Sequence, residues 1–174
     1  EQFRLPIEPG ERTFATGGPA LKVSAEGNEL TASSSKVNFV FDKKTGLVSS
    51  YKVGGTEYFK DGFGLQPNFW RAPNDNDYGN GNPKRLQVWK QSSKNFNVVD
   101  ANIVMDGKDA VLTANYLLAA GNLYIVTYRI SPSGVVKADF TFTSTDMEAA
   151  KTEASEATLM ATFTPGSDAA RKAA

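Results

Sequence analysis

The sequence contains no cysteine and no histidine among its 174 residues. Without cysteine there are no disulfides, thiolate nucleophiles or zinc–thiolate sites. Without histidine there is no serine or cysteine triad, and the most common general base and zinc ligand is missing. The sequence therefore excludes the usual serine and cysteine triads and the common zinc sites built from histidine or cysteine. A lack of cysteine is compatible with periplasm or cytoplasm alike, so the compartment stays open.

Net charge and long apolar runs are also missing. The 19 lysines and arginines balance the 19 aspartates and glutamates, so there is no net field to attract nucleic acid or an anionic membrane surface. No run approaches the ~20 apolar residues that a membrane helix requires. The first residues lack the pattern of a signal peptide, so we expect none in this sequence. We therefore expect no nucleic-acid partner and no membrane partner.

Alternating apolar and polar residues dominate what is present. They predict around nine strands separated by glycine-containing turns, a pattern typical of an all-β, antiparallel β-sandwich. In the turn that ends at Gly46, we expect the glycine to adopt a positive φ. The predicted strands cover residues 21–25, 29–33, 37–42, 47–53, 95–105, 110–118, 122–130, 135–143 and 157–163.

Other segments interrupt this pattern. Residues 1–19 are expected to be a linker or the end of a preceding domain, and residues 20–174 the sandwich domain. A single short helix is predicted over Pro83–Gln91, because proline suits a first helical turn. The segment Asp146–Glu156 is either a short helix or a flexible excursion. Both termini look cut, so we expect the chain to be part of a longer polypeptide.

The most unusual segment is the polar loop Arg71–Gly79, which follows the aromatic run Phe63–Trp70. Loops with this mixture, held by a rigid sheet, are where binding residues tend to lie. Tyr78 has no strand register to bury it, so we expect it to be exposed or to contact another domain. Gly79 and Gly81 lie in a stretch without a predicted regular element, and they serve either a passive turn or a hinge.

The residues of this loop suggest three kinds of chemistry. Asp75 and Asp77 could form a carboxylate pair, but we interpret them as caps of backbone amides, with one of them holding Arg71. A calcium site of the EF-hand type fails, because a loop starting at Asp75 has asparagine at its sixth position and leucine at its twelfth. Sugar contact by Trp70, Tyr78 and Trp89 remains open, although we interpret both tryptophans as core residues.

The run from Asn68 to Gly79 (NFWRAPNDNDYG), followed by Trp89-Lys90, resembles the signature of the small-chain domain of family 2 β-galactosidases. The stretch Asn38–Ser49 is similar to the strand-turn-strand that opens that domain. Glu1-Gln2-Phe3 is similar to the exit strand of the immunoglobulin-like domain before it. The likeness covers roughly residues 1–145. It implies the first part of a β-supersandwich of the galactose mutarotase type.

The resemblance also implies a division of labour. In this family the nucleophile and acid/base glutamates of the retaining reaction belong to a preceding TIM barrel, so no catalytic residue is expected in this chain. The partners would be that barrel, the immunoglobulin-like domain and, through the parent enzyme, a β-galactoside. We expect no cofactor or metal site here; any Mg or Na that the parent needs would bind outside the chain.

Particular residues receive roles from the same resemblance. Gly79 matches the hinge of a lid that closes over bound sugar, and Asn80–Lys84, including Gly81, would be its moving part, next to Tyr78. The scaffold that aims the lid would be Trp70, Arg71, Asp75 and Asp77. The chain alone is expected to be inactive. Two alternatives stay open: a free-standing carbohydrate-binding module, and a purely structural or interaction sandwich.

Overall fold

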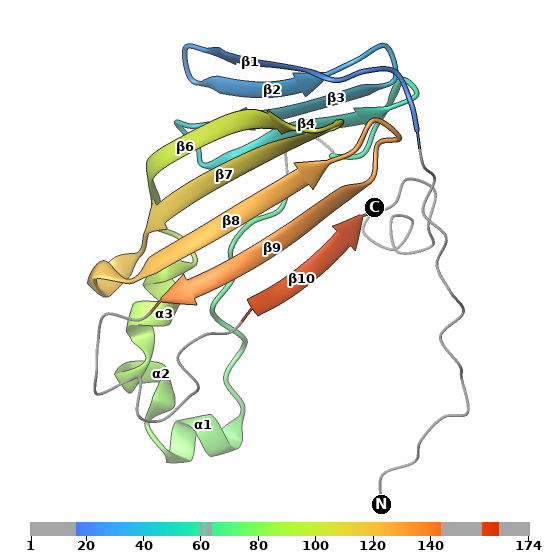
Figure 1. The fold of residues 1–174 in the computed structure, drawn as a ribbon. Coiled ribbons are helices and arrows are strands. Elements are labelled where there is room, and N and C mark those ends of the chain that lie inside the picture. Colours follow the sequence, from blue (N-terminus) through green and yellow to red (C-terminus); the bar gives the residue numbers. More distant parts are fainter. Residues whose placement is uncertain (1–16, 60, 62–63, 144–157, 164–174) are drawn as a thin grey trace, which may run out of the picture.

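Two antiparallel sheets make up the body of the molecule. The structure is a computed structural model, and it describes residues 17–59, 61, 64–143 and 158–163. The first sheet has the strand order β1-β2-β3-β4-β5 and the second β10-β9-β8-β7-β6, so each is a meander of neighbouring strands. Figure 1 shows the two sheets stacked as layers. The strands are β1 (Lys22–Glu26), β2 (Glu29–Ser33), β3 (Val37–Asp42), β4 (Leu47–Val53), β5 (Thr56–Glu57), β6 (Asn97–Asp106), β7 (Asp109–Leu117), β8 (Leu123–Ile130), β9 (Val136–Thr143) and β10 (Thr158–Phe163).

The all-β sandwich predicted from the alternation is confirmed. Strands β2, β3 and β4 have the predicted bounds, and the ends of the other predicted strands agree to within two residues. The two-residue strand β5 was missed, because it is too short to show a period. Its pairing with the end of β4 depends on the Gly54-Gly55 turn. The segment Asp146–Glu156 lies outside the described residues.

The core lies between the sheets because alternation turns every second side chain inward. On β3, the inward residues Val37, Phe39 and Phe41 are each at most 1% exposed. On β7, the inward residues alternate between small and large, from Ala110 to Tyr116, and all are buried. Removing one such phenylalanine side chain from water contributes about 2–3 kcal/mol, so this shared face provides most of the stability of the sandwich.

Two buried tyrosines tie the sheets together in a reciprocal manner. Tyr51 of β4 donates its hydroxyl proton to the carbonyl of Gly134, in the turn between β8 and β9 of the other sheet. Tyr116 of β7 donates to the carbonyl of Gly46, in the β3–β4 turn, at 2.8 Å. Gly46 has the predicted positive φ, at 70°. A Cβ there would lie 2.8 Å from Val98 Cγ2, so the close approach also requires glycine.

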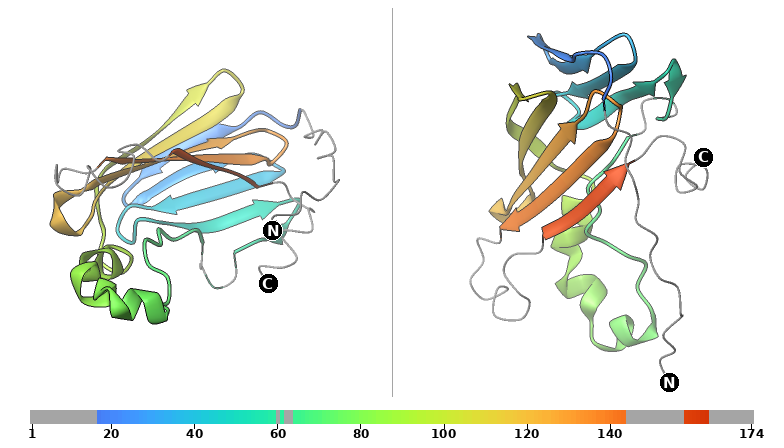
Figure 2. Two further views of the ribbon diagram at one scale, coloured as in Figure 1. Left: turned by 90° about the horizontal axis from the view of Figure 1, so that it is seen from below. Right: turned by 45° about the vertical axis from the view of Figure 1, so that its right-hand side comes forward.

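Three short helices interrupt the β pattern between the two sheets. They are α1 (Asp75–Gly79), α2 (Asn82–Arg85) and α3 (Gln87–Ser92). Figures 1 and 2 show them together at one end of the sandwich, beyond the strands. We call residues 70–94 the helical insert. No helix in the described part of the chain combines the length and hydropathy needed to cross a membrane.

The prediction of one helix over Pro83–Gln91 was wrong. Leu86 has φ −102° and ψ 18°, outside the helical range, and it separates α2 from α3. Pro83 does occupy the first turn of α2, as expected. The prediction that no regular element covers the stretch around Gly79 and Gly81 was also wrong, because Gly79 ends α1 and Asn82 begins α2.

Candidate functional site on the helical insert

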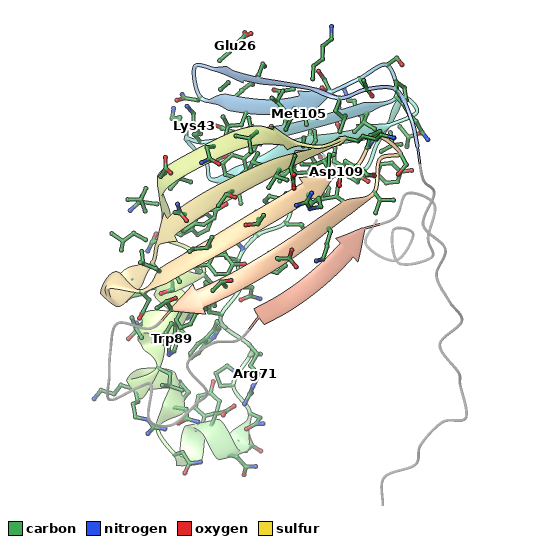
Figure 3. The ribbon with its side chains drawn as sticks, in the orientation of Figure 1. Glu26, Lys43, Arg71, Trp89, Met105 and Asp109 are labelled. Carbon is green, nitrogen blue, oxygen red and sulfur yellow. The ribbon has the colours of Figure 1, made fainter. Side chains whose placement is uncertain are left out.

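Aromatic side chains attach the helical insert to the second sheet. The ring of Trp89 on α3 lies 5.5 Å from that of Phe142 on β9 and 6.4 Å from that of Phe69. Phe69 in turn meets Tyr124 of β8 edge to face at 5.3 Å. Neither tryptophan belongs to the buried core, so the interpretation of both as core residues was wrong. Trp89 is half-buried and packs against Phe142 of the second sheet. In Figure 3 Trp89 lies close to the sheet, whereas Arg71 lies farther out on the insert.

A serine joins the two points where the helical insert leaves and rejoins the sandwich. The Ser93 hydroxyl accepts a hydrogen bond from the Phe69 backbone N–H at 2.7 Å and donates to the Trp89 carbonyl at 3.0 Å. The neighbouring Ser92 is fully buried and donates to the Val88 carbonyl. The base of the insert is therefore fixed, although its ends are 24 residues apart in sequence.

Helix α1 begins at a capping box. The Asn74 side chain accepts a hydrogen bond from the Asp77 N–H at 3.0 Å, and the Asp77 carboxylate accepts one from the Asn74 N–H at 2.8 Å. Such reciprocal caps satisfy amides that a helix leaves unpaired. Asp75 and Asp77 also place negative charge in the first turn, where it is favourable. The spacing Asn74–Asp77 was the signal for α1, and the sequence interpretation took these residues for turn formers.

Asp77 is the centre of a polar network. Its carboxylate accepts two hydrogen bonds from the Arg71 guanidinium, at 2.7 and 3.0 Å. It also accepts from the Asn82 amide at 3.2 Å. The prediction that one of the two aspartates holds Arg71 is thus confirmed for Asp77. The contacts of Asn82, which the sequence interpretation did not single out, link the start of α2 to the cap of α1.

The same network decides what Asp77 can do chemically. The hydrogen bonds from Arg71 and Asn74 lower the pKa of its carboxyl to about 2, so the group is ionised at neutral pH. A general acid must hold a proton near neutrality, and a metal ligand needs a free lone pair. Both Asp77 oxygens already face N–H donors. No cluster of three or more acidic side chains suited to a metal occurs in the described residues.

The two glycines assigned to the lid have different conformations. Gly79 is the last residue of α1, has no positive φ, and a Cβ built on it would meet nothing within 4 Å. Gly81 caps α2 with a left-handed φ of 67°. Asn80, between them, donates its backbone N–H back to α1. In this arrangement only Gly81 is required to be glycine; the hinge role of Gly79 stays a prediction.

An open depression lies on the outer part of the helical insert. Its volume is about 390 Å³. Two aromatic residues line it: Tyr78, which is 65% exposed as predicted, and Trp70, which is half-buried. The two tryptophans therefore differ, because Trp89 packs on the sheet and Trp70 lines the depression. The other lining residues are Pro73, Pro83, Lys84, Gln87 and Lys90.

The whole helical insert falls within a known family. A family model described as the β-galactosidase small chain matches residues 33–164. This chain belongs to the β-galactosidase small-chain family. The match includes most of both sheets as well as the network around Asp77.

Individual relatives agree with this assignment. A β-galactosidase of Priestia megaterium is 32% identical over 139 residues, which are 79% of this chain and 13% of that protein. One of Klebsiella pneumoniae is 33% identical over 122 residues, with 68% of this chain covered, and one of Kluyveromyces lactis is 29% identical over 119 residues. The small-chain domain described here spans 11–13% of the length of these relatives.

Proposed function

We propose that this small-chain domain is a non-catalytic accessory part of a retaining family 2 β-galactosidase that hydrolyses terminal β-D-galactosides. In such an enzyme two carboxylic residues about 5 Å apart act as nucleophile and acid/base, through a covalent glycosyl-enzyme intermediate. The Asp77 carboxylate already accepts hydrogen bonds from Arg71, Asn74 and Asn82, which supports an accessory role. The reacting carboxylates, and any Mg or Na, would then belong to other parts of the enzyme, among them the TIM barrel that the resemblance implies.

In this proposal the helical insert is a lid at the mouth of the active site. The supporting observation is its construction: α1 and α2 bury no residue, while the base is fixed by Phe69, Trp89 and Ser93. An element with few buried contacts opens at a low free-energy cost, and a fixed base keeps it attached to the sandwich while it moves. Trp70, Arg71, Asp75 and Asp77 would aim the lid, and Tyr78 to Lys84 would reach the sugar.

The two lid glycines provide the test. Ala fits Gly79 in the conformation described, so Gly79→Ala should favour the helical state of α1 by about 0.5–1 kcal/mol. Gly81→Ala would place a side chain at a φ of 67° and should disfavour the same state by about 1–2 kcal/mol. If the lid alternates between two states, the substitutions bias them in opposite directions.

The measurement is kcat and KM of the longer β-galactosidase that carries this chain, with a chromogenic β-galactoside. We expect each variant to change kcat and KM together, with opposite sign for Gly79→Ala and Gly81→Ala. Gly107→Ala is the matched control, because Gly107 also has a positive φ but lies in the β6–β7 hairpin. Unchanged kinetics in both lid variants would remove the lid from the proposal. Hydrolysis by the isolated chain would remove the accessory role.

A further inference from the structure

We propose that the depression on the helical insert binds an acidic sugar, that is, a pyranose ring carrying a carboxylate. All seven residues that line it come from the stretch Trp70–Lys90. Among the described residues, the lining thus comes from one short part of the chain. The depression shares Trp70, Tyr78, Pro83 and Lys84 with the proposed lid, but the inference concerns binding by this domain itself and requires no movement of the lid.

The walls of the depression suit a sugar ring. Trp70 and Tyr78 supply flat apolar faces, and Tyr78 is exposed although it is a large aromatic residue. Pro73 and Pro83 add rigid apolar surface with few conformations to lose on binding. Concave sites that combine aromatic walls with a few polar groups are typical of small-molecule binding. The Gln87 amide offers both a donor and an acceptor for hydroxyl groups.

Two lysines select the charge of the ligand. Lys84 and Lys90 line the depression, and neither lies within ion-pair distance of a carboxylate in the described part of the chain. Residues 70–94 contain five basic and two acidic side chains, whereas the whole chain is neutral. One of these acids, Asp77, is already paired with Arg71. The remaining positive field at the depression favours a carboxylate over a neutral sugar.

The composition favours a small ligand over a protein surface. Lysine is depleted at protein–protein interfaces, where arginine and aromatic residues are enriched. Here the two cations among the described residues that line the depression of about 390 Å³ are both lysines. The flexible ammonium groups of Lys84 and Lys90 line the same depression as Trp70 and Tyr78, so one ligand can carry both the ring and the carboxylate. An acidic segment of another protein is the alternative that the experiment must distinguish.

The experiment titrates the chain with D-galacturonate, D-galactose and acetate at low ionic strength. Binding is followed through the NMR signals of the Trp70 indole and of the Lys84 and Lys90 amides. We expect galacturonate to bind in the millimolar range and at least about tenfold more tightly than galactose or acetate, with an affinity that falls as salt is added. Galactose lacks the charge and acetate lacks the ring, so each tests one half of the site.

Variants locate the binding on the protein. Tyr78→Ala and the double variant Lys84→Gln/Lys90→Gln should each weaken galacturonate binding at least about threefold. Lys108→Gln is the control, because Lys108 is exposed in the hairpin at the far end of β6. Dispersed amide spectra of the sheets show that each variant is folded.

Several results would overturn the proposal. They are the absence of a saturable shift at Trp70, equal affinity for galactose or acetate, and an affinity that the double lysine variant leaves unchanged. Binding of a glutamate-rich peptide without binding of galacturonate would also overturn it, and would assign the depression to a protein partner. None of these results bears on the lid, which is tested by the kinetics of the glycine variants.

Discussion

The sandwich and the helical insert are ordered by different forces. The sandwich has an extensive apolar core between two sheets, with large side chains such as Phe39 and Phe41 almost fully buried. In the insert, α1 and α2 bury no residue and α3 buries only Ser92. Its order comes from the capping box, the Arg71–Asp77 ion pair and the hydrogen bonds of the Ser93 hydroxyl to Phe69 and Trp89. We infer that the sandwich is a rigid support and that the insert can rearrange without unfolding it.

The difference suits the proposed roles. Opening a region that lacks buried apolar area costs little compared with global unfolding, so such a region can move during a catalytic cycle. The aromatic contacts of Trp89 and Phe69 with Phe142 belong to the sandwich side of this boundary. The boundary between rigid and adjustable parts should therefore lie in α3, just before Trp89.

The largest effect is expected from a cavity in the sandwich. Phe39→Ala should reduce the free energy of unfolding by about 3–5 kcal/mol, because Phe39 is 1% exposed and its ring contacts Tyr51 and Tyr128. Urea denaturation measures the loss. Val40→Ala, on the opposite face of the same strand, should cost much less. A loss below about 1 kcal/mol for Phe39→Ala would contradict the account of the core.

A smaller and local effect is expected from the cap of α1. Asn74→Ala removes the acceptor for the Asp77 N–H and should weaken the helix by about 1 kcal/mol. Hydrogen exchange of the α1 amides should accelerate, while urea denaturation of the sandwich stays unchanged. Asn76→Ala is the matched control, because no hydrogen bond of its side chain is found in the described residues. If both variants act alike, the capping box does not order the insert.

The smallest effect is expected from pH. The folded pKa of Asp77 is about 2, below the ordinary value of 3.8, so its pairing is fully present above pH 3.8. The contribution is lost as the pH falls toward 2, because the carboxyl then takes up a proton. The Asn74 amide signal, which reports this bond, should move with a midpoint near pH 2. A midpoint near pH 4 would show that the Arg71–Asp77 network does not form in solution.

Much of the sandwich could be predicted from the sequence, because apolar and polar residues alternate in any strand that has one face buried and the other exposed. Val37–Asp42 alternates so regularly that the bounds of β3 were predicted correctly. Strand β5 is too short to show alternation. The reciprocal bonds from Tyr51 and Tyr116 were not predicted either, because they join segments up to 83 residues apart.

The helical insert was predicted less well because its signals are local and compete with one another. Asn74, Asp75 and Asp77 favour turns as much as they favour the start of a helix, so their residue types alone do not distinguish the two. The pairing of Arg71 with one aspartate was predicted, because Arg71 is the one basic residue in the loop and two carboxylates lie close to it in sequence. The depression was not predicted, because it requires Trp70 and Lys90, which lie 20 residues apart, to face the same space.

The central claim is that the helical insert moves in response to bound sugar while the sandwich does not. Hydrogen exchange of residues 74–92 in the longer β-galactosidase, with and without a saturating non-hydrolysable galactoside, tests this claim most directly. We predict that sugar changes exchange in this segment by about tenfold or more and leaves the amides of β3 and β7 unchanged. Identical exchange in residues 74–92 with and without the galactoside would contradict it.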